Sequence, residues 1–455
     1  MGLSTIILAA GQGTRMRSEL PKVLQALAGR PLLGHVLDCA AALQADDVCV
    51  VYGYGGEVVR SAFADDSLRW ALQAEQLGTG HAVQRAMPDT PDDNRVLILF
   101  GDVPLLTPAT CERLLEETPA GDVAVLTVDM DDPTGYGRII REGSEVSCIV
   151  EEKDAGPDER AVQEINTGVL ACPADKLRRW LEDLGNDNSQ GEYYLTDVIA
   201  MAVNDGVIVH GVKADSWTEV MGINDKKQLA EAERALQARL VDELMRDGVG
   251  FADPARVDIR GSLKCGKNVF IDVNAVFEGD VELGDGVKIE SNNLIRDSRL
   301  GAGTLVHSNC HIEGADTGRE CEIGPFARLR PGAQLANDVK VGNFVEIKKS
   351  TVADGSKVNH LTYIGDAEIG TGVNVGAGTI TCNYDGVNKH KTTIGDGAFI
   401  GSGVELVAPV KVGSGATIGA GSTITKNIDD DQLVLERARQ KAVPGWKKPT
   451  RKEAK

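Results

Sequence analysis

The chain has few aromatic residues and no long hydrophobic run. Aromatic side chains make up 4% of its 455 residues, so its cores must be built mainly from aliphatic side chains. No stretch of about 18 uncharged apolar residues occurs, which argues against a membrane-spanning helix. The beginning, MGLSTIILAAGQG, lacks the basic segment and the cleavage site of a secretory signal. We therefore expect a cytoplasmic protein without a membrane partner.

Paired cysteines and an excess of basic residues are also missing. The nine cysteines are odd in number and form no C-x-x-C pair, so neither a disulfide framework nor a zinc site is indicated. Lys and Arg number 48 against 68 Asp and Glu, a net charge of −20. This charge repels phosphate backbones, so we expect no nucleic-acid partner. An anionic substrate must then meet a local basic pocket.

Residues 1–226 carry the pattern of an α/β domain. Short apolar runs alternate with polar segments of helical period, which predicts a mostly parallel sheet covered by helices. Ligands of such sheets bind beyond the carboxyl ends of the strands. The clearest runs are Thr5 to Ala10, Val48 to Tyr52, Val96 to Phe100 and Val123 to Val128.

A single long helix is predicted over residues 227–247. Its apolar positions recur at intervals of three and four residues among charged ones, and Asp247-Gly248 ends the run. We expect this helix to connect the α/β domain to a second domain over residues 248–455. The recurring positions are Leu229, Ala232, Leu236, Leu240 and Leu244.

Residues 248–455 show a period of six, which neither a helix nor an ordinary strand has. A six-residue period with glycine at many corners, and 52 glycines in all, predicts a parallel β-solenoid with one inward aliphatic side chain per short strand. The phase slips around residues 382–391, which we expect to protrude as a loop, and residues 441–455 form a basic tail. The two longest unbroken series are Ile323, Leu329, Leu335, Val341, Ile347 and Ile394, Ile400, Leu406, Val412, Ile418, Ile424.

A glycine-rich turn follows the first predicted strand. The segment LAAGQGTRM and the LPK that follows lack the third glycine of G-x-G-x-x-G and the Gly-Lys-Ser/Thr of a P-loop. Small residues let backbone N–H groups approach a phosphate, and Arg15 and Lys22 can neutralise charge that develops in phosphoryl transfer. Taken alone, the segment is also compatible with a plain strand-to-helix turn.

Further polar segments follow in a fixed order. Phe100-Gly101-Asp102 ends an apolar strand and can place a carboxylate where Mg²⁺ bridges phosphates. The segment QAEQLGTGHA, residues 73–82, offers amide and backbone groups suited to a base edge. Four more segments complete the set, namely GYGR at 135–138, VEEK at 150–153, EINTG at 164–168 and GIN at 222–224.

Cations interrupt the solenoid repeats near its middle. Arg330, Lys348 and Lys349 lie next to inward-pointing aliphatic positions and suit a sugar phosphate. His360, in NHLTY, follows within one solenoid turn. A histidine with an ordinary pKa near 6.5 can accept a proton from an attacking amine at neutral pH. A single histidine usually has a surface or structural role, and we expect such a role for His307 and His311.

In this order, the segments of the first half resemble the sugar-1-phosphate nucleotidylyltransferases. With the hexapeptide half attached, the chain resembles the bacterial family of bifunctional N-acetylglucosamine-1-phosphate uridylyltransferases and glucosamine-1-phosphate N-acetyltransferases over residues 3 to 446. The resemblance implies a Rossmann-like nucleotidyltransferase domain, a linker helix and a left-handed parallel β-helix. It implies acetylation of glucosamine 1-phosphate by acetyl-CoA, then Mg²⁺-dependent transfer from UTP to N-acetylglucosamine 1-phosphate, giving UDP-N-acetylglucosamine for cell-wall and lipopolysaccharide synthesis.

The resemblance also implies the residues of the uridylyltransferase site. Arg15 and Lys22 would serve catalysis, and Asp102 and Asn224 match the two protein ligands of Mg²⁺. Phe100 stands where the family pattern leads us to expect Tyr. The nucleotide would be held by Leu8, Ala9, Ala10, Gly11, Lys22, Gln73, Gly78, Thr79, Gly101 and Asp102, and the amino sugar by Gly137, Glu151, Asn166 and Asn224.

For the acetyltransferase site the resemblance implies His360 as general base. It further implies a homotrimer with acetyl sites between subunits, and a basic tail that helps to hold the phosphates of CoA. The implied sugar-phosphate residues are Arg330, Lys348, Tyr363 and Asn374, and those of acetyl-CoA are Ala377, Asn383, Tyr384, Ser402, Ala420 and Arg437.

Two alternatives remain open from the sequence. The chain could be a single-activity sugar-1-phosphate nucleotidylyltransferase whose solenoid serves assembly, but His360, Arg330 and Lys348 would then have no role. It could also be a non-catalytic scaffold descended from such enzymes. A scaffold should have lost its charged site residues, yet Lys22 and Asp102 are present.

Overall fold

The computed structural model describes residues 2–64 and 67–449. Residues 450–455 of the predicted basic tail therefore lie outside the described part. The chain divides into two compact units, Met1–Arg239 and Leu240–Lys455. Across the described residues, no helix has the length and apolar character needed to cross a membrane.

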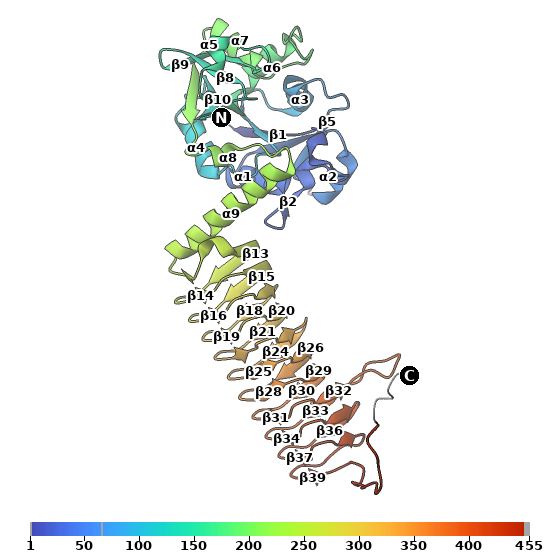
Figure 1. The fold of residues 1–455 in the computed structure, drawn as a ribbon. Helices are drawn as coiled ribbons and strands as arrows, with labels where there is room; N and C mark the ends of the chain where they lie inside the picture. The colour runs from blue at the N-terminus through green and yellow to red at the C-terminus, as the bar shows by residue number, and fades with distance from the viewer. Residues whose placement is uncertain (1, 65–66, 450–455) are drawn as a thin grey trace, which may run out of the picture. The chain divides into compact units, whose positions relative to one another are not determined.

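The first unit is built on a nine-stranded sheet (Figure 1). Its main path runs β11-β7-β10-β6-β1-β4-β5, and the hairpin β8-β9 attaches to β10. The predicted apolar runs are confirmed as β1, β4, β6 and β7, whose side chains are largely buried. The strands are β1 (Leu3–Ala9), β4 (Asp47–Tyr52), β5 (Leu68–Leu72), β6 (Arg95–Phe100), β7 (Val123–Asp129), β8 (Arg138–Glu142), β9 (Glu145–Val150), β10 (Glu164–Pro173) and β11 (Val209–Lys213), with a separate short pair β2 (Ala26–Leu27) and β3 (Arg30–Pro31).

Helices cover both faces of this sheet, and two apolar clusters form the cores on its two sides. Both clusters consist mainly of aliphatic side chains, as the low aromatic content predicts. The helices are α1 (Leu32–Ala42), α2 (Gly56–Ala62), α3 (Thr79–Ala86), α4 (Pro108–Glu116), α5 (Pro157–Arg160), α6 (Ala174–Glu182), α7 (Asp197–Asn204), α8 (Trp217–Val220) and α9 (Lys226–Arg246), with short 3-10 turns η1 (Thr14–Met16), η2 (Lys22–Leu24) and η3 (Met87–Asp89).

Strand direction sets the position of the site. Strands β1, β4, β5 and β6 run parallel, so their carboxyl ends meet at one edge. Strand β10 is antiparallel to both β6 and β7, so its first residues lie at that same edge. The hairpin pairs Arg138, at the start of β8, with Val150, at the end of β9. Residues 137 and 151 therefore come together beside it.

The second unit is a parallel β-solenoid, drawn from yellow to red in Figure 1. Together with the family shown below, this architecture confirms the left-handed parallel β-helix. A short 3-10 turn, η4 (Pro254–Arg256), lies near its start. One 11-stranded sheet contains β12 (Gly250–Phe251), β14 (Phe270–Ile271), β16 (Lys288–Ile289), β19 (Leu305–Val306), β22 (Glu322–Ile323), β25 (Lys340–Asn343), β28 (Lys357–His360), β31 (Asn374–Val375), β34 (Phe399–Ile400), β37 (Thr417–Ile418) and β39 (Leu433–Val434).

A second, 17-stranded sheet makes up the rest of the coils. It contains β13 (Val257–Cys265), β15 (Ala275–Leu283), β17 (Leu294–Arg296), β18 (Arg299–Leu300), β20 (His311–Glu313), β21 (Ala315–Thr317), β23 (Arg328–Leu329), β24 (Ala333–Leu335), β26 (Glu346–Lys348), β27 (Ser350–Val352), β29 (Tyr363–Gly365), β30 (Ala367–Ile369), β32 (Ile380–Cys382), β33 (Thr392–Ile394), β35 (Glu405–Val407), β36 (Val410–Val412) and β38 (Thr423–Ile424).

The six-residue period places the core of the solenoid. Every aliphatic position of the two unbroken series is buried, because a short strand can turn only one side chain inward before each corner. Partners on successive coils are 17 residues apart between Val358 and Val375, but 25 apart between Val375 and Ile400. The eight additional residues fall at the predicted loop, where Tyr384 and Val387 are 60% and 82% exposed.

The predicted long helix is confirmed as α9, and its two halves pack in different units. Ala232 and Leu236 are buried, and Arg239 donates from Nη1 to the Leu105 carbonyl in the first unit. Val241 belongs to the apolar core of the solenoid. The division between the two compact units thus falls inside the helix.

Candidate active sites

The first pocket, of about 250 Å³, lies at the carboxyl ends of the parallel strands. The sequence-predicted nucleotide residues come from four separate parts of the chain, and the structure brings nearly all of them to this pocket. Gly101 is the exception: it is buried, and a Cβ on it would lie 3.3 Å from side-chain atoms of Ala9 and Val23. The predicted residues that line the pocket are Leu8, Ala9, Ala10, Gly11, Lys22, Gln73, Gly78, Thr79 and Asp102.

The glycine-rich turn brings the backbone close to Lys22. Gly13 has a φ of 60°, and a Cβ placed on it would lie 2.6 Å from Cβ of Lys22. Any side chain at residue 13 would therefore be strained and would push the lysine away. The turn accordingly holds the stem of Lys22 against the pocket.

Hydrogen bonds hold the amide groups of residues 73–80 in place. The Gln73 side chain is buried and donates from Nε2 to the Gly78 carbonyl at 3.0 Å. At the pocket mouth, Gln12 Nε2 donates to Oε1 of Gln76 at 3.2 Å. Gly78 has a φ of 111°, and a Cβ there would lie 2.5 Å from the Tyr193 carbonyl oxygen. Only glycine fits this position without strain.

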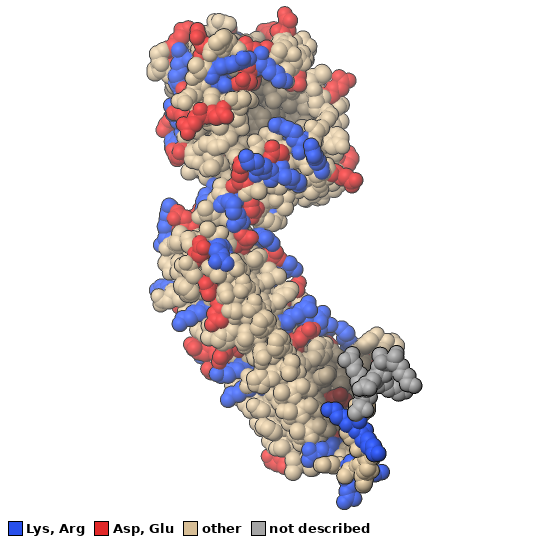
Figure 2. Space-filling model, in the orientation of Figure 1, with Lys and Arg blue, Asp and Glu red and all other residues tan. Residues whose placement is uncertain are grey.

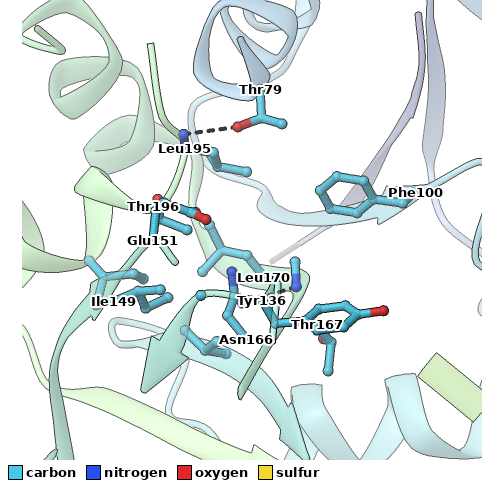
Figure 3. Close-up of a pocket in the computed structure, with 15 residues that line it drawn as sticks. Thr79, Phe100, Tyr136, Ile149, Glu151, Asn166, Thr167, Leu170, Leu195 and Thr196 are labelled. Atoms are coloured by element: carbon cyan, nitrogen blue, oxygen red, sulfur yellow. Dashed lines mark hydrogen bonds between the residues drawn. The ribbon is translucent and has the colours of Figure 1, made fainter. Parts of the chain in front are cut away.

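A second pocket of about 220 Å³ adjoins the first, and Thr79 and Phe100 line both. Figure 3 shows its side chains. Gly137, Glu151 and Asn166, three residues predicted to hold the amino sugar, line this pocket. They meet because residues 137 and 151 flank the hairpin and Asn166 lies near the start of the antiparallel strand β10.

Glu151 brings a carboxyl group to the wall of this second pocket. Burial raises its pKa above the ordinary value, although Thr196 donates a hydrogen bond that opposes the rise. The Thr196 hydroxyl donates to Oε1 of Glu151 at 3.1 Å. The carboxyl group is thus held in one orientation toward the pocket.

Asp102 and Asn224, the two residues predicted to hold Mg²⁺, are brought together although 122 positions separate them in the chain. The Ile223 N–H donates to the Asp102 carbonyl at 2.8 Å, which fixes the two segments side by side. Lys22 forms an ion pair with Asp102, and its Nζ donates to Oδ1 of Asn224 at 3.1 Å. The two side-chain oxygens therefore converge on one positive charge. Carboxylate and amide oxygens are the ligands that Mg²⁺ prefers, so the donor set fits the ion.

Like Gly101, Arg15 and Asn224 are predicted site residues of this unit that line neither pocket, although Asn224 lies beside Lys22. Arg15 lies in η1 and is exposed. Phe100, which replaces the expected Tyr, offers no hydroxyl, and its ring packs where a Cβ on Gly168 would lie 2.6 Å away. The aromatic ring thus separates the two pockets without a polar contact of its own.

Sequence reasoning missed the segment at residues 192–196. Tyr193 bonds through its backbone to Leu77 and Gly80, and the Leu195 N–H donates to Oγ1 of Thr79 at 3.1 Å (Figure 3). The segment has no regular secondary structure, so no periodicity marks it. Thr196, in this segment, lines the second pocket.

In the solenoid, the cationic residues lie on neighbouring coils. Pairing of Leu329 with Ile347 sets Arg330 beside Lys348, and Arg330 donates from Nη1 to Oε1 of Glu346 at 2.7 Å. The nearby Lys389 ammonium lowers the pKa of Lys348 below its ordinary value, because two positive charges disfavour each other. A negatively charged group bound here would relieve that repulsion.

His360 lies at the end of β28 and is exposed. Its Nδ1 lies 2.9 Å from Oδ1 of Asn343 on the preceding coil. A carboxamide oxygen only accepts, so in the neutral imidazole Nδ1 carries the proton and Nε2 carries the lone pair. The imidazole is therefore arranged to accept a proton at Nε2.

Four of the residues predicted to hold acetyl-CoA form a column on successive coils. Gly403 donates to the Ala377 carbonyl and Gly421 to that of Ser402. Arg437 donates from Nη1 to the Ala420 carbonyl at 3.1 Å. The column begins beside the histidine, since the Gly378 N–H donates to the His360 carbonyl at 3.2 Å.

The other predicted residues of this half differ in exposure. Asn383 is buried and donates from Nδ2 to Oδ2 of Asp366 at 2.6 Å. Tyr384 is exposed on the loop, and its hydroxyl donates to the Gly386 carbonyl. Tyr363 pairs in register with Glu346, and Asn374 with Lys357. Tyr363 thus lies on the coil of His360, which follows that of Lys348, and Asn374 lies on the next coil.

Comparison with known proteins covers both halves of the chain. Residues 5–185 match the family model described as MobA-like NTP transferase domain. Residues 391–426 match the one described as bacterial transferase hexapeptide, six repeats. Bifunctional protein GlmU of Aromatoleum aromaticum is 57% identical over 453 residues, which cover 99% of this chain and 100% of that protein. The chain belongs to the GlmU family.

Other GlmU relatives agree with this assignment. The protein of an Azoarcus species is 56% identical over 450 residues, and that of Acinetobacter baumannii is 53% identical over 449. Each alignment covers 99% of this chain and at least 99% of the relative. GlmU membership confirms the resemblance inferred from the motifs. It also confirms that the chain is a bifunctional uridylyltransferase and acetyltransferase making UDP-N-acetylglucosamine.

Proposed function

We propose that the two activities occupy separate sites, uridylyl transfer in residues 1–226 and acetyl transfer in residues 248–455, with residues 227–247 as the linker. The observation that carries this proposal is the convergence of dispersed polar residues at two places. One is the pair of adjoining pockets in the α/β unit, and the other is the set of coils around His360.

In the uridylyltransferase half, the first pocket would hold UTP and the second N-acetylglucosamine 1-phosphate. The phosphate oxygen of the sugar attacks the α-phosphorus of UTP, and pyrophosphate leaves. Such a displacement depends on positioning and charge neutralisation. Lys22, which lines the nucleotide pocket, supplies a positive charge there, and Glu151 and Asn166 hold the sugar.

Asp102 and Asn224 would hold Mg²⁺ through the two oxygens that converge on Lys22. A bound Mg²⁺ supplies neutralisation of the charge that builds on the phosphates during transfer. The protein's contribution is to keep these oxygens at the edge of the nucleotide pocket, where Asp102 also lines the wall.

In the acetyltransferase half, Nε2 of His360 would take the proton from the amino group of glucosamine 1-phosphate as that nitrogen attacks the thioester carbon of acetyl-CoA. The C–S bond then breaks and the thiolate of CoA leaves. Arg330 and Lys348 would bind the phosphate, since both cations lie on adjacent coils. Tyr363 and Asn374 would position the sugar. The column from Ala377 to Arg437, with Asn383 and Tyr384, would hold acetyl-CoA.

We further propose that the chain assembles as a homotrimer through one apolar column of the solenoid. This column consists of Phe326, Phe344 and Leu361, which are 50%, 55% and 63% exposed. The two phenyl rings stack with centroids 5.3 Å apart. Figure 2 shows, on its visible face, a band of the later coils with few charged side chains. Leu361 follows His360 directly, so contact here would place the base near a subunit boundary.

A cytoplasmic location also fits the thiols. All nine cysteines are free, and each is buried or half-buried, as expected in a reducing compartment. The basic tail from Lys441 is a further candidate for binding CoA phosphates, with its last six residues outside the described part.

Mass spectrometry of products tests the paired activities. The purified chain is incubated with glucosamine 1-phosphate, acetyl-CoA, UTP and Mg²⁺, with one component omitted in each parallel reaction. UDP-N-acetylglucosamine should form only in the complete mixture, and N-acetylglucosamine 1-phosphate should accumulate without UTP. Uridylylation of supplied N-acetylglucosamine 1-phosphate without any acetylation of the free amine would instead favour a solenoid that serves assembly alone.

The variant Asp102→Ala tests the separation of the sites. The substitution removes the Asp102 carboxylate, one of the two oxygen ligands beside Lys22. UDP-sugar formation should therefore fall below detection, while acetyl transfer continues at the parent rate. Loss of both activities, or of neither, would contradict independent sites.

A further inference from the structure

Lys22 contacts both of the oxygens to which the proposed function assigns Mg²⁺. Its ammonium pairs with Asp102, where the two side chains are 12% and 17% exposed. The same nitrogen donates to Asn224 Oδ1 at 3.1 Å. One ammonium group therefore occupies the point on which the carboxylate and the amide oxygen converge.

A divalent cation and an ammonium group cannot share these two oxygens at contact distance. Both would lie within a few ångströms of each other in a half-buried place, where repulsion between like charges is weakly screened. We propose that the Lys22 ammonium competes with the divalent cation for Asp102 and Asn224, so that the nucleotide-free enzyme binds the cation weakly. This inference rests on the proposed placement of Mg²⁺.

The nucleotide provides the displaced ammonium with a new partner. Lys22 lines the same pocket as Leu8 to Gly11, the turn proposed to meet the phosphates. The stem of the lysine is confined, since Gly13 approaches its Cβ closely. Movement is therefore limited to the outer torsions, and the ammonium stays within reach of the pocket. Phosphate oxygens are strong acceptors for an ammonium group.

Competition of this kind couples the two ligands. Phosphates that draw Lys22 away free the two oxygens for the cation, and a bound cation frees Lys22 for the phosphates. Coupling of binding sites is reciprocal, and typical values are about 5- to 150-fold. The lysine would thus make the cation and the nucleotide bind together, and either alone would bind less tightly.

Manganese binding to the full-length chain tests this inference without any catalytic readout. Free Mn²⁺ is measured by electron paramagnetic resonance while nucleotide-free protein is titrated, first as the parent and then as Lys22→Met and Lys22→Arg. Because the chain carries a net charge of −20, other carboxylates will also bind Mn²⁺. The site is therefore defined as the binding lost when Asp102→Asn is added in each background.

A matched control removes a different lysine. Lys176 is half-buried and donates to the Gly121 carbonyl at 2.8 Å, so Lys176→Met changes the net charge equally without touching the two oxygens. Thermal denaturation of each variant confirms that it is folded.

Lys22→Met should bind Mn²⁺ at the Asp102-dependent site at least about tenfold more tightly than the parent, within the usual range of coupling. Lys22→Arg and Lys176→Met should remain within about threefold of the parent. A change below threefold in Lys22→Met, or weaker binding, would overturn the inference. Repeating the titration with UTP distinguishes failure of the competition from failure of the Mg²⁺ placement. An Asp102-dependent site that appears with UTP, but whose Mn²⁺ affinity in the nucleotide-free protein does not change in Lys22→Met, refutes the competition alone. The lack of any such site, even with UTP, refutes the Mg²⁺ placement as well.

Discussion

At the scale of single residues, His360 shows how one contact assigns a chemical role. Its Nδ1 is bound to Asn343, which leaves Nε2 to accept a proton. Loss of a general base costs about 10²- to 10⁴-fold. We therefore expect His360→Ala to lower kcat of acetyl transfer by that factor and to leave uridylyl transfer unchanged, as measured by separate assays of the two products.

A second histidine of the solenoid provides the control. His311 lies on β20, outside the proposed sites, so His311→Ala should leave both rates unchanged. If His360→Ala lowers acetyl transfer by less than about threefold, the imidazole is not the base.

Glu151 links burial to the pH dependence of stability. Burial raises its pKa above the ordinary 4.5, so the folded state holds this proton more tightly than the unfolded state does. The parent should therefore lose stability as pH rises from about 4.5 through the raised pKa. Glu151→Gln removes this cost.

The expected result is that Glu151→Gln has a higher melting temperature than the parent at neutral pH, with the difference vanishing near pH 4.5. Thermal denaturation over a series of pH values measures it. Glu145→Gln replaces an exposed carboxylate and should change the melting temperature little. A Glu151→Gln variant that is less stable than the parent at pH 7 would show that the ionised carboxylate is stabilised in the fold.

At the scale of elements, the turn before α3 depends on one glycine. Gly78 has a φ of 111°, and a Cβ there would meet the Tyr193 backbone, which holds the 192–196 segment against the pocket. Gly78→Ala should therefore displace the 73–80 and 192–196 segments from each other. Because the nucleotide would then be held in the wrong position, KM for UTP should rise at least about tenfold. Acetyl transfer should remain intact.

Gly121→Ala is the matched control, because a Cβ at Gly121 meets nothing within 4 Å and its φ is not positive. Initial rates over a range of UTP concentrations distinguish the two variants. Equal KM values for both would mean that the turn tolerates a side chain and that Gly78 has no special role.

At the scale of the whole molecule, the apolar column of Phe326, Phe344 and Leu361 predicts the assembly. A charge in the centre of a buried apolar contact is costly, so Phe344→Asp should convert the proposed trimer to a monomer in sedimentation velocity. The rate of acetyl transfer should fall when the assembly is lost, and the rate of uridylyl transfer should persist.

Val58→Asp places the same charge on a side chain that is also 55% exposed, on α2, and should remain trimeric. A parent chain that sediments as a monomer, or a Phe344→Asp variant that stays trimeric, would remove this column from the interface.

Periodicity predicted the architecture of both units because it reports which side chains are buried. Ile323, Ile347 and Ile400 are all fully buried, as a strand with one inward position per corner demands. The runs of β1 and β6 were equally clear, since a strand covered on both faces must be continuously apolar. The antiparallel direction of β10 was not predicted, because an apolar run has the same pattern in either direction.

Local pattern and composition specify the two architectures, the order of the motifs and the residue types available for chemistry. Which of those residues meet depends on the folded chain. Ile223 bonds to Asp102 and so brings Asn224 to Lys22, while Thr196 reaches Glu151 from a segment without periodicity. Arg15, by contrast, remains exposed. Contacts between distant segments depend on strand direction and on backbone hydrogen bonds in three dimensions, which neither spacing nor composition records.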